Sequence, residues 1–366
     1  MPEHAVLNAG NARNTHLDST GNLSIADEWT FRRTAVMIAI TVETPLAQRL
    51  NHPLHGDSQM QPSDLDLWIR RDPAGRGLFS QHHHESPPCA EHLASASNEL
   101  VTQAKSVAVV TGFYVPDATT PAAETDGPLG ATLLADVLNL SGVETLIITD
   151  ELCESTVRTA MASCGVEIEL LVCPIDRSLS HAWREELWSC EPGRSLTHLI
   201  SVERVGPSLH EAHHEASCRN MRGQPIDDWS ADLYRLFEEC PAHIRTIGIG
   251  DGGNEIGMGT FWDEIGYRLS PPLHACRTPT NWTVLAGVSD WGAMALATAF
   301  TVLRSDLGPL NLWTTDRLLY ALEQMVEAGP TIDGCTQLAE PTIDGLPFAT
   351  YIQPWELIRQ LLGLDL

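Results

Sequence analysis

The chain has 366 residues, of which 43% are hydrophobic and 19% are charged, a composition typical of a globular protein with a sizeable core. Its 22 basic and 48 acidic side chains give a formal net charge of −26, which argues against nucleic acid or an anionic membrane surface as a partner, because both repel an acidic chain. The sequence has no apolar run of ~18 residues, no signal-peptide pattern and no CxxC pair among its nine cysteines. It therefore predicts a cytoplasmic protein with reduced thiols.

The first 60 residues are polar and irregular, and we expect an N-terminal extension over 1–60 ahead of an α/β catalytic domain over 61–366. Ser63 is an N-cap candidate, so a helix is predicted from there to about Arg70. After residue 90, apolar runs and amphipathic segments alternate. The predicted helices cover residues 90–105, 129–140, 151–164, 227–239, 291–303, 316–327 and 355–362, and the predicted strands cover residues 106–112, 145–149, 167–172, 198–202, 246–249 and 283–286.

Short apolar strands that alternate with amphipathic helices specify βαβ units. The expected fold is therefore α/β, with a mostly parallel sheet and helices on both faces, in the manner of a doubly wound, Rossmann-like domain. In such a sheet the ligand lies beyond the carboxyl ends of the strands, among the loops that follow them. The polar residues of this sequence gather in those loops.

Three of these loops carry side chains suited to chemistry. Glu124 and Asp126 precede a helix, Glu203 and Arg204 follow a strand, and Ser289 precedes another helix. Asp126 and Ser289 could instead cap their helices, and Glu203 with Arg204 could form an ordinary ion pair. Arginine is nonetheless suited to bidentate binding of a carboxylate.

The strongest signal is the loop over residues 250–259, which combines five glycines in ten positions with Asp251, Asn254 and Glu255. Its glycines allow the backbone to approach a ligand closely, and its N–H groups can surround an anion. A tight structural turn and a dinucleotide-binding loop are the alternatives. The second is disfavoured, since an acidic residue among the N–H groups would repel a pyrophosphate, so no nucleotide cofactor is expected.

Several motifs coincide with those of one known family. They lie at residues 71–78 (Arg-Asp-Pro-Ala-Gly-Arg-Gly-Leu), 125–128, 203–204 with 206–207, 220–222, 247–259, and 286–289 with 291–292. At these positions the sequence resembles the D-glutamate cyclase family, specifically its C-terminal catalytic domain. The resemblance covers roughly residues 65–366 and departs from the family over residues 209–218.

The resemblance implies an enzyme, a carbon–oxygen hydro-lyase that closes D-glutamate to 5-oxo-D-proline with loss of water. That closure needs a base for the α-amine, neutralisation of the γ-carboxylate and an acid for the departing hydroxide. A small amino-acid substrate is thus the expected partner. The sequence predicts no particular oligomeric state.

The roles that the resemblance implies fall into three groups. Either Glu255 or Asp251 is the expected base, and Arg204 with Arg222 is expected to hold the α-carboxylate while the loop N–H groups face the γ-carboxylate. The proposed catalytic residues are Glu255, Asp251 and Asn254. The proposed substrate-binding residues are Arg204, Glu203, Arg222, Gly252, Gly253 and Ser289. An oxygen-rich site for Mg²⁺ or Mn²⁺ is expected at Glu124, Asp126 and Asp251.

Two other functions use the same residues. A metal-dependent amidohydrolase or lactam hydrolase would use the acidic loop with a bound water, and it would open a lactam instead of forming one. A module that only binds an amino acid would keep the arginine and the glycine loop but show no turnover. The crowding of Asp, Asn and Glu in one flexible loop favours an enzyme over the binding module.

Overall fold

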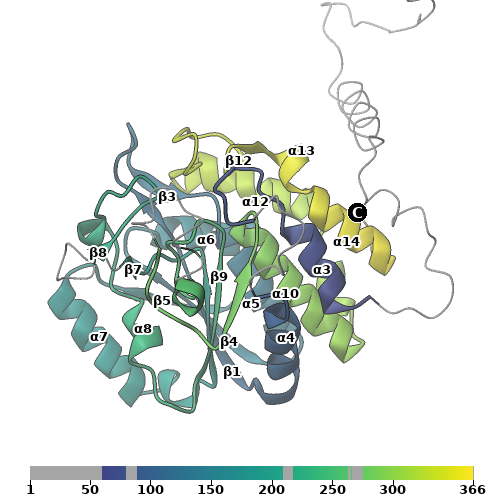
Figure 1. Cartoon of the computed structure of the whole chain (residues 1–366), viewed down its shortest axis with the longest axis horizontal. Helices are drawn as coiled ribbons and strands as arrows, with labels where there is room; N and C mark the ends of the chain where they lie inside the picture. The colour runs from purple at the N-terminus through teal and green to yellow at the C-terminus, as the bar shows by residue number, and fades with distance from the viewer. Residues whose placement is uncertain (1–59, 80–88, 209–216, 263–264, 266–274, 366) are drawn as a thin grey trace, which may run out of the picture. The chain divides into compact units, whose positions relative to one another are not determined.

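A six-stranded sheet lies at the centre of the computed structural model, and every neighbouring pair of its strands is parallel. The strand order is β5–β4–β1–β6–β9–β10 (Figure 1), so the chain runs outward in both directions from β1. This order confirms the predicted doubly wound α/β fold. The strands are β1 (Ser106–Thr111), β4 (Glu144–Asp150), β5 (Glu169–Cys173), β6 (His198–Val202), β9 (Arg245–Gly250) and β10 (Trp282–Leu285).

The structure describes residues 60–79, 89–208, 217–262, 265 and 275–365, which belong to one compact unit, Met60–Leu366. The expected N-terminal extension lies outside the described residues except for Met60, and so does most of the segment that departs from the family. Within the described ranges, no helix combines the length and the apolar character that crossing a membrane requires.

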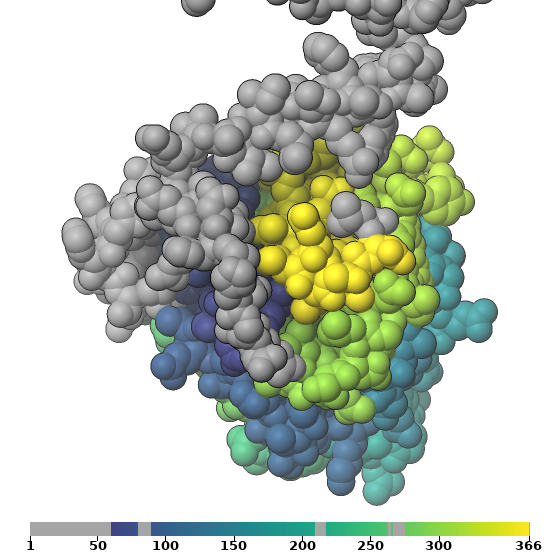
Figure 2. Space-filling view, turned by 90° about the vertical axis from the view of Figure 1, so that its right-hand side faces the viewer, coloured from purple at the N-terminus to yellow at the C-terminus, as the bar shows by residue number. Residues whose placement is uncertain are grey.

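Alternate residues of the central strands enter two different cores. In β1, Val107 and Val109 belong to one core, and Ala108 and Val110 belong to the other. The first core lies under helices α4, α5, α6 and α10, on which α3, α12 and α14 pack, and Figure 2 shows α14 (yellow) at the surface beside α3 (purple). The second core lies under α7 and α8.

Helices on both faces of the sheet are thus observed, as predicted. Their bounds are α3 (Pro62–Ile69), α4 (His92–Gln103), α5 (Pro128–Leu140), α6 (Glu154–Ser163), α7 (Arg177–Ser189), α8 (Arg235–Glu238), α10 (Ser289–Arg304), α11 (Gly308–Asn311), α12 (Thr315–Ala328), α13 (Phe348–Tyr351) and α14 (Gln353–Leu362), with short 3₁₀ turns η1 (Gly193–Ser195), η2 (Asp227–Trp229) and η3 (Gly259–Phe261).

Three small sheets lie outside the central one. Strands β2 (Tyr114–Val115), β3 (Ala122–Glu124) and β11 (Thr331–Ile332) form the first. Hairpin β12 (Thr342–Ile343) with β13 (Leu346–Pro347) forms the second, and β7 (Pro207–Ser208) with β8 (Ser217–Cys218) forms the third. The first two sheets bring the C-terminal part of the chain to the loop before α5.

The predicted helix over residues 227–239 is wrong. That segment instead forms η2, an extended stretch and the single turn of α8. The reason is that backbone groups at its centre have other partners: Ala231 donates its N–H to Asp150 and accepts from the guanidinium of Arg204. These bonds take the place of helical ones.

Two other helices differ from their predictions in smaller ways. The N-cap of α3 is Gln61 and not Ser63, because Pro62 occupies the first helical position, and the backbone N–H of Gln61 donates to the Asp64 carboxylate. Helix α7 was not predicted. It buries only Ser180, Arg184 and Leu187, so its buried side is mostly polar and lacks the apolar residues that mark a helix in a sequence.

Candidate active site

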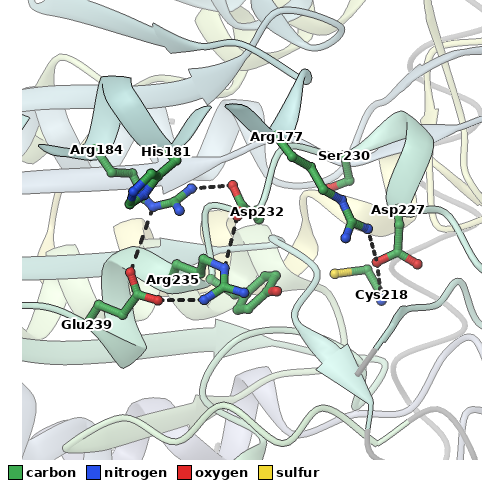
Figure 3. A pocket seen from close by; sticks show the side chains of 10 residues that line it. Arg177, His181, Arg184, Cys218, Asp227, Ser230, Asp232, Arg235 and Glu239 are labelled. Atoms are coloured by element: carbon green, nitrogen blue, oxygen red, sulfur yellow. Dashed lines mark hydrogen bonds and ion pairs between the residues drawn. The ribbon is translucent and has the colours of Figure 1, made fainter. Parts of the chain in front are cut away.

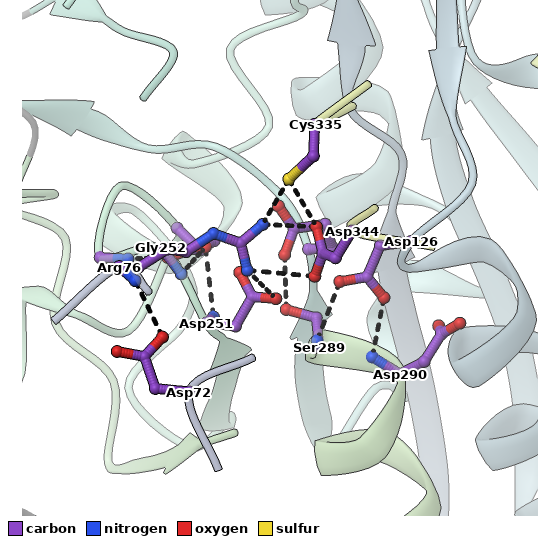
Figure 4. Close-up of polar contacts among 12 residues, drawn as sticks. Asp72, Arg76, Asp126, Asp251, Gly252, Ser289, Asp290, Cys335 and Asp344 are labelled. Carbon is purple, nitrogen blue, oxygen red and sulfur yellow. Dashed lines mark hydrogen bonds and ion pairs between the residues drawn. The ribbon is translucent and has the colours of Figure 1, made fainter. Parts of the chain in front are cut away.

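The loops at the carboxyl ends of β6 and β9, together with the starts of α5 and α10, bring three buried carboxyl groups together. Carboxyl oxygens of Asp126, Glu203 and Asp251 all lie within 4.8 Å of one another (Figure 4 draws this region). We call these three residues the acidic triad. They lie beyond the position where the sheet order reverses, between β1 and β6, which is where doubly wound sheets bind their ligands.

Asp126 is held by the first turn of α10. Its carboxylate accepts from the backbone N–H groups of Ser289 at 2.9 Å and Asp290 at 3.0 Å, and also from that of Gly127. In return, the Asp290 carboxylate accepts from the N–H groups of Gly127 and Gly130 at the start of α5. Asp290 of α10 therefore caps α5, and Asp126, which precedes α5, caps α10, so the positive end of α10 faces a member of the triad.

Glu203 has an unusual backbone conformation, with φ of 46°, in the left-handed region that residues other than glycine rarely occupy. Its side chain accepts from the hydroxyl of Ser289 at 2.5 Å. A Cβ at Gly127 would lie 2.7 Å from the Cβ of Glu203, so only glycine fits there. Burial, followed by Glu255 and Glu124, raises the pKa of Glu203 well above its ordinary value. Strained residues of this kind are concentrated at functional sites.

The glycine loop is folded around Glu255. This fully buried carboxylate accepts from the N–H groups of Gly252 at 2.6 Å, Gly253 at 2.7 Å and Asp251 at 3.2 Å. The loop N–H groups that the sequence assigned to a substrate carboxylate therefore have an internal partner. The loop in turn directs Asp251 into the triad. Asn254 lies beside it and donates its amide to the backbone oxygen of Arg219 at 2.9 Å.

Arg76 supplies the positive charge at the triad. Its guanidinium lies 2.7 Å from the Asp251 carboxylate and also pairs with Asp344 in the β12–β13 turn (Figure 4). Asp72 holds the segment in place by accepting from the N–H groups of Arg76 and Gly77, each at 2.8 Å. Burial acts to raise the pKa of Asp344, but Arg76 outweighs it and the net pKa is below the ordinary value.

Glu124 and Asp251 each have a buried oxygen without a hydrogen bond among the described residues, but the Asp251 oxygen lies 2.7 Å from the guanidinium of Arg76. For Glu124, that oxygen is Oε1. Burial, followed by Asp344 and Asp126, raises its pKa well above the ordinary value. A Cβ at Gly334 would lie 2.0 Å from its other carboxyl oxygen, so the backbone closes over this side chain. Glu124 is not a member of the triad; Glu203 occupies the third position.

Arg204 and Arg222 lie elsewhere than the sequence suggested. Arg204 is fully buried and pairs with Asp150 at 2.6 Å, while it also donates to the backbone oxygen of Gly112 at 2.7 Å. Its contacts thus join the ends of β1, β4 and β6. Arg222 is half-exposed and pairs with Asp117 at 2.7 Å.

The triad has the properties of a site for a hard divalent cation. It offers carboxylate oxygens, which Mg²⁺ and Mn²⁺ prefer, and the oxygens are close enough to share one ion. Burial raises the pKa of Asp126 and of Asp251 as well as that of Glu203, even though Arg76 lowers the pKa of Asp251. When all three carboxyl groups are ionised, their negative charge exceeds what the single guanidinium of Arg76 compensates, so the triad fits a divalent metal in charge as well as in ligand type.

Two residues at the site were not named in advance. Arg76 lies in the motif at residues 71–78, so its sequence signal was present without an assigned role. Asp344 gave no signal because the strands around it have only two residues each. Its position depends on a pairing of β11 with β3 across a long sequence separation.

Comparisons with known proteins identify the family of the chain. A family model described as D-glutamate cyclase-like, C-terminal, matches residues 65–362. The human protein named D-glutamate cyclase, mitochondrial, is 28% identical to the chain over 315 residues, which is 78% of this chain and 49% of that protein. The chain thus spans about half the length of this relative. With the family model covering most of its residues, the chain belongs to the D-glutamate cyclase-like C-terminal family.

Proposed function

We propose that the chain is a carbon–oxygen hydro-lyase that closes D-glutamate to 5-oxo-D-proline and releases water. The observation that carries this proposal is the buried acidic triad with Arg76 at the reversal point of the sheet, in a chain of this family. The name of the human relative supports the substrate, and the acids support the chemistry.

The reaction forms one bond and breaks another. The α-ammonium group loses two protons as its nitrogen bonds to the carbon of the γ-carboxyl group, while one C–O bond of that group breaks and the oxygen leaves with two protons as water. The carboxylate must be neutralised before it is attacked, and the leaving oxygen needs a proton. Holding the amine and the carbon of the γ-carboxyl group together supplies much of the acceleration.

Asp126, Glu203 and Asp251 would hold Mg²⁺ or Mn²⁺ in this proposal. The ion, when bound, would act as a Lewis acid toward the γ-carboxylate. Arg76 lies against Asp251 and is the cation that we assign to the substrate carboxylate, in place of the fully buried Arg204. Glutamate carries two carboxylates and one ammonium group, so its recognition requires such positive charge in an otherwise acidic site.

Glu124 is the residue that we assign to proton transfer. Its oxygen without a partner and its raised pKa favour a protonated carboxyl, which can donate to the departing oxygen. Glu255 and Asp251 were the expected bases. The contacts of Glu255 with the loop N–H groups support a positioning role for it, because both of its oxygens are engaged.

The reaction is tested by incubating the purified chain with D-glutamate and, separately, L-glutamate, with and without Mn²⁺, while 5-oxoproline is measured directly. We expect 5-oxoproline from D-glutamate only, and only with the metal. A parallel incubation with 5-oxo-D-proline measures ring opening. Ring opening without any net closure from either glutamate would instead indicate a lactam hydrolase, and binding of glutamate without turnover would indicate a binding module.

Two substitutions separate proton transfer from positioning. Glu124→Gln cannot donate an acidic proton, so kcat should fall by roughly 10²–10⁴-fold with KM nearly unchanged and with no loss of thermal stability. Glu255→Gln turns an amide toward loop N–H donors, so it should lower the melting temperature and raise KM as well as lower kcat.

Glu323→Gln, an exposed substitution on α12, is the control and should leave all three quantities unchanged. If Glu255→Gln lowered kcat alone while Glu124→Gln remained fully active, the proton-transfer role would return to Glu255.

A further inference from the structure

A polar pocket lies between α7 and the segment from β8 to α8, with a volume of about 290 Å³ (Figure 3). No residue of the acidic triad lines it. Its walls carry three arginines, Arg177, Arg184 and Arg235, and three acids, Asp227, Asp232 and Glu239. A function for this pocket does not follow from the reaction proposed above.

The sequence places basic side chains on one face of α7. Arg177, His181 and Arg184 are four and three residues apart, the spacing that aligns side chains along a helix. Arg235 of α8 adds a third guanidinium from the other side of the pocket. The chain has only 22 basic residues against 48 acidic ones, so three arginines around one hollow are a marked local concentration.

The acids of the pocket are already engaged. Asp232 accepts from Arg184 and lies 3.0 Å from Arg235, and Glu239 accepts from Arg235 at 2.6 Å. Asp227 accepts from the N–H of Cys218 at 3.0 Å and from a serine hydroxyl. Their carboxylates therefore have donors from the protein itself.

The arginines, in contrast, retain donors without acceptors. The side chain of Arg184 is only 6% exposed, yet its Nε makes no hydrogen bond among the described residues. This Nε lies 4.0 Å from the carboxylate of Glu239, which is too far for a hydrogen bond. The guanidinium of Arg177 lies 3.7 Å from Asp227 and makes no hydrogen bond within the described part of the chain. The pocket thus presents more N–H donors than it has acceptors.

We propose that this pocket is a second binding site, for a small molecule with a compact oxyanion, a carboxylate or a phosphate group. Guanidinium groups suit both, because their N–H donors match two oxygens of one anion. Arg184 would supply the buried contact, and Arg177 and Arg235 would bind the anion from the rim. Ser230, which lines the pocket, accepts from Arg204 at 2.8 Å, so the pocket adjoins the buried pair of Arg204 and Asp150.

The test is isothermal titration of the full-length chain with inorganic phosphate and, in a separate series, with malonate, at an ionic strength held constant with sodium chloride. We expect saturable binding of at least one probe. Tighter binding of phosphate would identify a phosphate site, and tighter binding of malonate a carboxylate site. Arg177→Ala and Arg235→Gln should each weaken the binding by at least about tenfold, a typical loss for one charge-assisted contact.

Arg245→Ala is the matched control. Arg245 is also exposed and also lies 3.7 Å from its acidic partner, Glu99, but it is at the amino end of β9 and does not line the pocket. It should bind the probes as the wild type does, and melting curves should show all three variants folded. Failure of both probes to bind, unchanged binding in the two pocket variants, or an equal loss in Arg245→Ala would overturn the proposal.

Discussion

Arg204 and Arg76 show how two arginines in one region take different roles according to their burial. Arg204 is fully enclosed and its charge is matched by Asp150, which is itself fully buried. Arg76 reaches the acidic triad from a segment far away in the sequence and remains partly accessible, with 14% of its side chain exposed. A buried, matched pair organises the fold, whereas a partly accessible guanidinium among unmatched acids can receive a ligand.

Removing Arg204 should therefore lower the stability of the fold, and this effect should be larger than any direct effect on substrate binding. Arg204→Met leaves Asp150 charged and buried without its cation, and we expect the free energy of unfolding to fall by about 3–5 kcal/mol in urea denaturation. Arg158→Met removes an exposed pair with Glu154 and should cost less than about 1 kcal/mol. A folded Arg204→Met with a raised KM alone would instead support the substrate contact that the sequence suggested.

Asp66 on α3 gives a pH-dependent prediction that does not involve the active site. Burial raises its pKa to about 6, although Arg70 acts in the opposite direction. The folded state therefore binds this proton more tightly than the unfolded state, whose pKa is near 3.8. Stability from this group is present at low pH and is lost as the pH rises through about 6.

Asp66→Asn removes that titration and can still accept from Arg70. At pH 8 the variant should be more stable than the wild type by about 2–3 kcal/mol, since one pKa unit corresponds to about 1.4 kcal/mol. The difference should shrink below pH 6 and vanish below about pH 4, as measured by urea denaturation across this range. The exposed substitution Asp316→Asn should show no such trend. A stability difference between variant and wild type that does not change with pH would mean that the pKa of Asp66 is not raised in the folded state.

At the residue scale, the sequence named acids that the structure brings together, but it did not give the contacts of each side chain in their loops. Asp126, Glu203 and Asp251 were all named, because acids that follow the strands of a parallel sheet meet at one edge. Whether a side chain faces the ligand or the protein depends on which backbone groups approach it. Glu255 shows this: the N–H groups that bind it belong to its own loop, whose folding no spacing rule predicts.

At the scale of elements, the reciprocal capping of α5 and α10 is the feature that fixes the site. The Asp290 carboxylate accepts from two N–H groups of α5 and from the hydroxyl of Tyr351 at 2.9 Å. Because the same turn of α10 donates to Asp126, a shift of either helix would move a member of the triad. The geometry of the triad therefore depends on the packing of the two helices.

Asp290→Ala removes one half of this arrangement. The loss of a cap and of a buried hydrogen bond should lower the free energy of unfolding by about 1–3 kcal/mol. Asp290→Asn is the matched control, since its amide oxygen can still accept from both N–H groups and its amide can donate to Tyr351. Chemical denaturation of both variants is the measurement. Equal destabilisation by the two substitutions would indicate that the charge of Asp290, and not its acceptor geometry, holds the helices.

Elements whose sequence pattern reflects burial in the core were predicted accurately, whereas a segment held by contacts with distant residues was not. The strand over residues 198–202 was placed correctly, because all five of its residues are buried and apolar runs mark such strands. The segment from 227 to 239 was not, because its backbone is bonded to Asp150 and Arg204, which come from other parts of the chain. Contacts of that kind leave no periodic signal in a sequence.

At the scale of the whole molecule, the net charge of −26 and the buried triad act together. Bringing several carboxyl groups into one buried site raises their pKa values, which opposes folding at neutral pH. A divalent cation bound at the triad would remove that penalty. Folding and metal binding are therefore expected to be linked, whichever reaction the site performs.

Mn²⁺ should accordingly raise the melting temperature of the chain, and excess EDTA should reverse the rise. At a metal concentration about 100 times the dissociation constant, the expected stabilisation is about 2.7 kcal/mol. An acidic chain also attracts cations without any specific site, so the increase alone is not sufficient. Asp251→Asn removes one ligand of the triad and should abolish most of the increase, whereas Asp316→Asn lowers the net charge equally at an exposed position and should preserve it. If both variants kept the full shift, the stabilisation would come from the surface charge of the chain and the triad would not be its metal site.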